Sequence, residues 1–447
     1  MQRIHCYLIL ATFLFPSLQL VAQNSGTLTK PNHQQQKTER KKKASDNAIN
    51  VKSFNVVWQT IKDSHWQPEK VGADWDKARE ELYPRIVAAK SIQESRDIMS
   101  ELIGRLNQSH FGLIPADSYS VIEDEDVGGN SDVGLTVRLV ENQLVVTAVR
   151  PESSAASAGV QPGWSILKIR DKEAGNLISK IAKVDKGPQR SDTTIGMAMQ
   201  NYCSGSTDSA IAFEFTNNNN QLVRLELPCK KAPGKYTKFG NLPAIRVADK
   251  ASTLEADIGY YHFSAFLDPI RIMPAYRKAV RDAQHSGGMV IDLRGNIGGI
   301  AAMTMGMAGE FVTEKRKLGT LMMKGTELDF FANPMPKPYP APVAVIVDEC
   351  SISSAEIFAG GLKDLGLARI FGRRTAGLAL PSTVIKLPNG DGFQYAFADY
   401  HSANGQTLEV NGVIPDENIE LTRQNLKDES DPALRAAVHW ILSKNSG

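Results

Sequence analysis

The stretch VAVIVDECSISSAEIFAGGLKD, residues 343–364, decides the fold. Its first five residues are all apolar, a pattern typical of a parallel strand that is buried on both faces. Ser353 and Glu356 have the spacing of an N-terminal capping box, so a helix is expected to begin at Ser353. A buried strand that runs directly into a helix indicates an α/β sheet, with Ser353 at the edge of that sheet.

A second stretch, GMVIDLRGNIGG (288–299), predicts a neighbouring strand that ends in a turn with three glycines. Without a Cβ atom, Gly298 and Gly299 leave their backbone amides uncovered. Bare amides at a strand end suit an oxyanion, which needs fixed hydrogen-bond donors. We therefore expect an oxyanion hole formed by the Ser354 amide together with that of Gly298 or Gly299.

The chain has 447 residues, too many for one ordinary domain, and 42% are hydrophobic, enough for several cores. Residues 47–117 have helical periodicity, with apolar residues at i, i+3, i+7 and i+11 from Trp75 to Ile86. Residues 118–232 alternate as short strands, and residues 233–447 alternate between strands and helices. The fold class is therefore a multidomain α/β protein with an N-terminal helical piece, a β-rich insert and an α/β core.

The first 46 residues differ in composition from the rest. Residues 1–23 have the basic start and apolar run of a secretory signal peptide, too short and too weakly flanked for a stable membrane span. Residues 24–46 lack apolar periodicity and are expected to form a disordered basic linker. Since the positive charge is concentrated in this linker, the sequence indicates no nucleic-acid surface.

The exported chain would keep three cysteines, Cys203, Cys229 and Cys350. Their wide spacing gives no metal motif, so we expect neither a metal nor another cofactor. Cys203 and Cys229 could form a disulfide outside the cytoplasm or remain two buried thiols, and the sequence leaves both open.

Ser353 itself has two readings. It could simply cap the helix, or it could be a nucleophile that the helix dipole and free amides favour when charged. The joint pattern DLRGNIGG, VDECSISSAEIFAGGLKD and GRRTAG (372–377) resembles the C-terminal processing peptidases and their tricorn-type relatives. This resemblance covers nearly the whole exported chain. It implies a crotonase-like catalytic core and a serine peptidase with Ser353 as the nucleophile.

The processing-peptidase branch pairs its serine with a lysine 25 residues later, but Leu378 stands there. Arg373 and Arg374 cannot replace that lysine, because a guanidinium keeps its proton. The tricorn-type branch uses a histidine and a glutamate instead. Its pattern matches RLNQSHFGLIP (105–115) and TLEVNGVIPDEN (407–418). The resemblance to this branch implies three further site residues, namely the base His110, the orienting carboxylate Glu409, and Ser109 within the same network.

His401 is the alternative base if His110 lies far from the serine. In the insert, PESSAASAGVQPGW (151–164) resembles a PDZ domain, although Trp164 replaces the usual aspartate. That resemblance implies a carboxylate-binding loop near Val133, Gly134 and Leu135 that captures a peptide terminus by strand addition.

We therefore predict an exported serine endopeptidase, periplasmic or extracellular in a bacterial envelope. Its partners would be unfolded or C-terminal polypeptide segments, and its oligomeric state stays open. One alternative is an inactive peptidase-like scaffold whose PDZ-like domain binds peptide C-termini. Another is a small-ligand carrier similar to the retinoid-binding relatives of the family.

Overall fold

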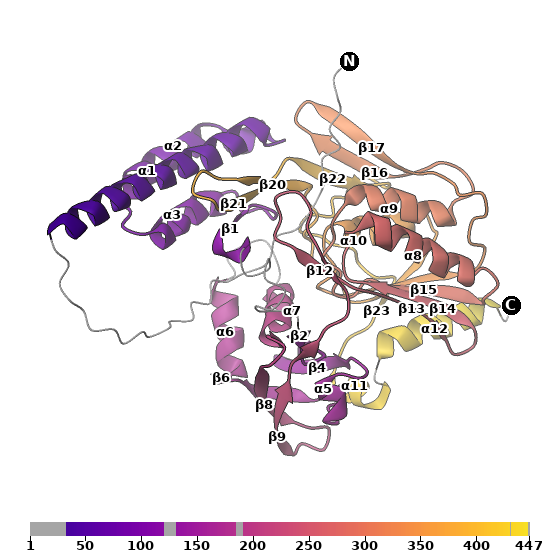
Figure 1. The fold of residues 1–447 in the computed structure, drawn as a ribbon. Helices are drawn as coiled ribbons and strands as arrows, with labels where there is room; N and C mark the ends of the chain where they lie inside the picture. The colour runs from indigo at the N-terminus through magenta and orange to yellow at the C-terminus, as the bar shows by residue number, and fades with distance from the viewer. Residues whose placement is uncertain (1–32, 120–130, 185–190, 430, 446–447) are drawn as a thin grey trace.

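The computed structural model describes residues 33–119, 131–184, 191–429 and 431–445 (Figure 1). The expected signal peptide lies outside these residues. Within the described part of the chain, no helix combines the length and the apolar character needed to cross a bilayer.

Three helices form the N-terminal piece: α1 (His33–Ser64), α2 (Ala73–Ala88) and α3 (Ile92–Gly104). The predicted stripe of α2 is confirmed, because Trp75, Ala78, Leu82 and Ile86 are all buried. Helix α3 begins after a cap in which the Ser91 side chain accepts a hydrogen bond from the Glu94 amide, and it ends at Gly104.

The expected disordered linker requires a correction. Its residues 33–46 are the first part of α1 and not a coil. Lys, Arg, Gln and Glu are good helix formers, and a helix already nucleated by packing over residues 50–64 extends at little cost.

A short strand ties the helical piece to the distant hairpin of β20 (Ser382–Lys386) and β21 (Gly392–Ala396). Strand β1 (Gly112–Ile114) pairs antiparallel with β21, so that Gly112 lies opposite Gln394. An ion pair of 2.7 Å between Arg96 of α3 and the fully buried Asp391 fixes the same junction. These contacts place residues 109 and 110 against the core.

The insert is built on a sheet in the order β3-β4-β5-β8-β9, so the side of β3 away from β4 is an open edge in the described part of this sheet. Its strands are β3 (Leu135–Val140), β4 (Gln143–Val149), β5 (Ser165–Ile169), β6 (Lys172–Glu173), β8 (Ala210–Thr216) and β9 (Leu222–Pro228). Its helices are α5 (Ser154–Ser157), α6 (Ala174–Val184) and α7 (Ser191–Tyr202). The short strands expected over residues 118–232 are thus present in the described part of the insert. A small sheet joins β2 (Ser131–Asp132), β7 (Ser204–Gly205) and β10 (Lys230–Lys231).

The core is a six-stranded sheet in the order β13-β14-β15-β18-β19-β23, parallel except for the edge pair β13–β14. Its strands are β13 (Asp249–Leu254), β14 (Ile258–Phe263), β15 (Gly288–Asp292), β18 (Val343–Val347), β19 (Arg369–Gly372) and β23 (Glu417–Asn418). The predicted strands β15 and β18 lie side by side at its centre, buried along their whole length.

Helices cover both faces of this sheet (Figure 1). Helices α8 (Pro269–Asp282), α9 (Ala301–Ala308) and α10 (Ser354–Asp364) pack on one face, and α12 (Pro432–Asn445) packs on the other. Alternate residues of β15 divide between the two layers, with Ile291 facing the first and Val290 the second. The remaining elements are β11 (Lys235–Thr237), β12 (Ile245–Val247), β16 (Arg316–Met323), β17 (Thr326–Ala332), β22 (Ala398–Ser402), α11 (Arg423–Glu429) and the 3-10 helices η1 (Pro68–Val71) and η2 (Gly309–Phe311).

Candidate active site

Ser353 lies at the junction between β18 and α10, in a strained backbone conformation with φ of 56° and ψ of −116°. Positive φ is uncommon for residues other than glycine and is typical of functional sites. The side chain is 0% exposed, and its Oγ forms no hydrogen bond with any described residue. The capping box predicted from the sequence lies at this junction, with Ser353 at the N-cap and Glu356 three residues later.

Glu356 is the second member of that box, and it also holds the neighbouring segment 375–378. Its carboxylate accepts hydrogen bonds from the Ser353 amide at 2.9 Å and the Leu378 amide at 3.0 Å. It also accepts from the Thr375 hydroxyl and the Gly377 amide, at 2.6 and 2.8 Å. Burial raises the pKa of Glu356 to about 7, although these donors act in the opposite direction. The Ser353 amide also donates to the Leu378 carbonyl, so Leu378 bridges the serine and the carboxylate.

His110 lies between α3 and β1, is 2% exposed, and also has a positive φ, 60°. Its Nδ1 atom lies 2.7 Å from the Ser109 hydroxyl oxygen. That hydroxyl donates its proton to Glu409 Oε2 at 2.8 Å, so toward the ring the oxygen can only accept. The hydrogen-bond pattern therefore assigns the proton of a neutral ring to Nδ1 and the lone pair to Nε2. Burial lowers the pKa of His110 to about 3, which keeps the ring neutral.

Glu409 is buried, and it joins three distant segments. It accepts hydrogen bonds from the Ser109 amide at 3.1 Å, the Ser109 hydroxyl and the Ala379 amide at 2.9 Å. Burial raises the pKa of Glu409 to about 7, although these hydrogen-bond donors lower it. Ala379 directly follows Leu378, whose carbonyl holds Ser353. The serine half and the histidine half of the site thus meet at residues 378 and 379.

The glycine turn lies against the serine. A Cβ atom at Gly298 would come within 2.7 Å of Ser353 Cβ and 2.9 Å of the Ser354 nitrogen, so only glycine fits. The Gly298 amide donates to the Asn296 side chain at 2.9 Å, whereas the Gly299 carbonyl accepts from the Ser354 hydroxyl at 2.8 Å. Of the two candidate glycine donors, the geometry therefore favours the Gly299 amide for an oxyanion.

The other predicted residues lie apart from this network. His401 is on β22, with its Nε2 atom 3.4 Å from Asp399. Val133, Gly134 and Leu135 lie at the start of the open edge of β3, and the Val133 amide already donates to the Cys203 carbonyl. Beside this edge, a cleft of about 470 Å³ between the insert and the core is lined by residues such as Thr136, Gly196 and Gly295.

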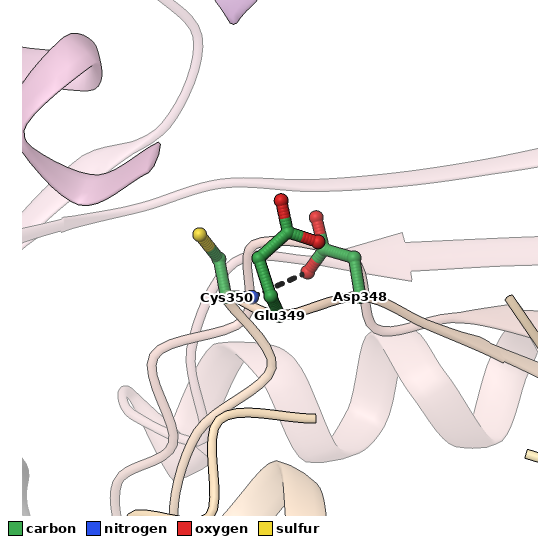
Figure 2. A group of neighbouring side chains, drawn as sticks. All are labelled: Asp348, Glu349 and Cys350. Atoms are coloured by element: carbon green, nitrogen blue, oxygen red, sulfur yellow. Dashed lines mark hydrogen bonds between the residues drawn. The ribbon is translucent and has the colours of Figure 1, made fainter. Parts of the chain in front are cut away.

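The cluster Asp348, Glu349 and Cys350 lies just before the serine (Figure 2). Within the described residues, this is the group whose ligand atoms are close enough for a metal ion, all within 4.8 Å of one another. However, Asp348 receives two hydrogen bonds from Arg138 of the insert, and Glu349 pairs with Arg373. Burial raises the pKa of Glu349 to about 7. Two guanidinium groups already neutralise these carboxylates, so the cluster fits an ion-pair contact between insert and core better than a metal site.

Sequence reasoning missed two contributors to this architecture. Thr375 donates to Glu356 and accepts from the Val413 amide, which fixes the segment before Leu378. Arg138 joins the insert to the end of β18 through Asp348. Thr375 is part of the GRRTAG pattern and could have been noticed there. Arg138 had no local signal, because its partner lies 210 residues away.

Comparisons with known proteins identify similar families and folds. The family model for peptidase family S41 matches residues 257–419, and that for the tricorn protease C1 domain matches residues 51–104. A carboxyl-terminal-processing protease of Synechocystis sp. is 24% identical over 379 residues, covering 84% of this chain and 82% of the relative. The corresponding protease of Picosynechococcus sp. is 22% identical over 368 residues, covering 81% of each protein.

Two solved structures share the fold. A photosystem II D1 C-terminal processing protease aligns with a TM-score of 0.56 and 18% identity, over 87% of this chain and 97% of that one. Mature CPAF aligns with a TM-score of 0.60 and 12% identity, over 90% and 99%. The match to peptidase family S41 over residues 257–419, together with the similarity to carboxyl-terminal-processing proteases over most of the chain, supports a serine-type peptidase.

Proposed function

We propose that this peptidase cleaves through an acyl-enzyme on Ser353, with His110 as general base and Glu409 acting through Ser109. The observation that carries the proposal is the Ser109 hydroxyl, which donates to Glu409 and accepts from His110 Nδ1. This arrangement leaves the Nε2 lone pair of a neutral imidazole for proton transfer. It also provides a carboxylate that stabilises the imidazolium once it forms.

In the first step, the Ser353 Oγ–H proton passes to His110 Nε2 while Oγ attacks the carbonyl carbon of the peptide. The resulting oxyanion receives hydrogen bonds from the Ser354 amide and from the glycine turn, through Gly299 or Gly298. When the C–N bond breaks, His110 returns the proton to the leaving amine, and an ester on Ser353 remains. Water then repeats the sequence and releases the new carboxyl terminus. No resident metal or cofactor takes part.

The described state requires a movement before this chemistry. Ser353 Oγ is fully buried and has no hydrogen-bond partner among the described residues. The hydroxyl and the imidazole must therefore come into contact when substrate opens the site. Catalytic hydrogen bonds often tighten only in the complex with substrate.

The proposed substrates are unfolded or C-terminal polypeptide segments outside the cytoplasm. The support is the edge strand β3, whose start at Val133–Leu135 resembles a PDZ carboxylate loop, and the cleft beside it. Export from the cytoplasm is supported by the composition of residues 1–23, which is typical of a signal peptide. The proposed divisions are 47–117 for the helical domain, 118–232 for the PDZ-like domain and 233–447 for the peptidase core.

A fluorophosphonate probe tests the assignment, because it labels only an activated serine. Labelling should occur in the wild type and disappear in both Ser353→Ala and His110→Ala. Labelling that survives in Ser353→Ala would place the nucleophile elsewhere. Binding of peptide C-termini without any labelling of the wild type would instead support the scaffold without turnover.

A further inference from the structure

Glu409 is followed at once by a strained turn. Val410 has a φ of 65°, and the Asn411 amide donates to the Glu409 carbonyl at 2.8 Å. This hydrogen bond closes a three-residue γ-turn of the rare positive-φ type. A β-branched residue seldom adopts such a φ value. The Val410 side chain is 54% exposed, so apolar burial of that side chain does not account for the strain.

Residues 374–377 hold this turn through hydrogen bonds to its backbone. Arg374 donates from Nη2 to the Val410 carbonyl at 2.5 Å and from Nε to the Asn411 carbonyl at 2.6 Å. The Val410 amide donates to the Gly377 carbonyl at 2.8 Å. A Cβ atom at Gly377 would lie 2.6 Å from the Val410 carbonyl oxygen, so the two segments are in close contact.

The segment that holds the turn also holds the carboxylate. Ala379, five residues beyond Arg374, donates its amide to Glu409 Oε2. Residues 374–379 thus hold both the Glu409 side chain and the backbone of the two residues that follow it. A strained conformation persists only where its surroundings over-determine it, and such positions are concentrated at functional sites.

We propose that Arg374 is a positioning residue that holds the Glu409–Asn411 turn and thereby aims the Glu409 carboxylate at Ser109. This inference rests on the proposed roles of Glu409, Ser109 and His110. The planar guanidinium contacts two successive carbonyls at once, which the single ammonium group of a lysine cannot reproduce from the same position.

The test compares Arg374→Met with the wild type, using denatured fluorescein-labelled casein as substrate. The variant should lower kcat about tenfold and leave KM within about twofold, because the lost contact acts on the chemical step. Adding Val410→Gly should restore most of kcat, since glycine adopts a positive φ without strain. If Arg374→Met does not fold, Arg374→Lys, which loses one of the two contacts, serves in its place.

Lys363→Met is the matched control. Lys363 also donates to a backbone carbonyl of this loop, that of Ile414 at 2.6 Å, but beyond Glu409. Its loss should leave kcat within about twofold of the wild type. The rate of fluorophosphonate labelling should follow kcat across all variants.

Three results would overturn the inference. They are an unchanged kcat in Arg374→Met, a failure of Val410→Gly to restore it, or an equal loss in Lys363→Met. Glu409→Gln separates this inference from the proposed function. If Glu409→Gln keeps full activity, the assigned site is wrong. If Glu409→Gln loses most of its activity while Arg374→Met loses none, only the positioning role of Arg374 is rejected.

Discussion

The two halves of the candidate site are held in different ways. The serine half is centred on one junction, where β18 runs into α10 and Glu356 binds the Ser353 amide three residues away, and its further contacts come from residues 375–378 and the glycine turn. The histidine half is assembled from the helical piece, the β20–β21 hairpin and the loop at Glu409, with partners up to 300 residues apart. A nucleophile can thus be specified by local sequence, whereas its base here depends on the packing of whole segments.

The largest effect should come from removing either reactive group. His110→Ala and Ser353→Ala should each lower kcat by at least about a thousandfold, and the double variant should lose no more than either one, because the groups act as a unit. Steady-state hydrolysis of denatured casein measures this. A His110→Ala enzyme with near wild-type activity would show that the two halves are not one site.

The next effect concerns the junction that carries the histidine half. Arg96→Ala should destabilise the fold by about 3 kcal/mol, because it leaves the buried Asp391 carboxylate without its cation. Chemical denaturation measures the free energy of unfolding. Arg85→Ala, which removes an exposed ion pair with Glu101, is the control and should destabilise the fold far less, because exposed ion pairs contribute little to stability. Equal losses in the two variants would contradict the assigned role of the junction.

The titration of the Glu409 carboxylate should appear in the pH dependence of the free energy of unfolding. Its pKa in the folded state, about 7, is above the ordinary value of 4.5, so its contribution is fully present below pH 4.5 and is lost as the pH rises through 7. Glu409→Gln removes this titration. The stability of the wild type relative to the variant should therefore fall between pH 4.5 and 8, by on the order of 3 kcal/mol.

Urea unfolding at several pH values checks this expectation. Glu226→Gln, which changes an exposed carboxylate on the insert, is the control. A pH-independent difference between the wild type and Glu409→Gln would mean that Glu409 is already ionised throughout this range.

The smallest effect should come from the cap of α3. Ser91→Ala removes the hydroxyl that accepts from the Glu94 amide and should lower stability by about 1 kcal/mol. Its activity should match that of the wild type, because the cap lies at the end of α3 away from His110. A large loss of activity in this variant would show that the histidine half responds to any weakening of the helical piece.

The same contrast explains what the sequence could predict. The strands β15 and β18, the stripe of α2 and the position of Ser353 follow from local patterns of apolar residues and turns. The linkage of Ser109 to Glu409 was expected only through family resemblance. The pairing of β1 with β21 and the contacts of Arg374 gave no local signal, since each joins residues that only the complete fold brings together.

One consequence follows from the 300 residues that separate Ser109 from Glu409. At ordinary rates of ribosomal synthesis, Glu409 is made about 15–60 s after Ser109. Under the proposed assignment, a nascent chain cannot attack its neighbours or itself during that interval. The hydrogen-bond network of the candidate site therefore cannot form before residue 409 has been made.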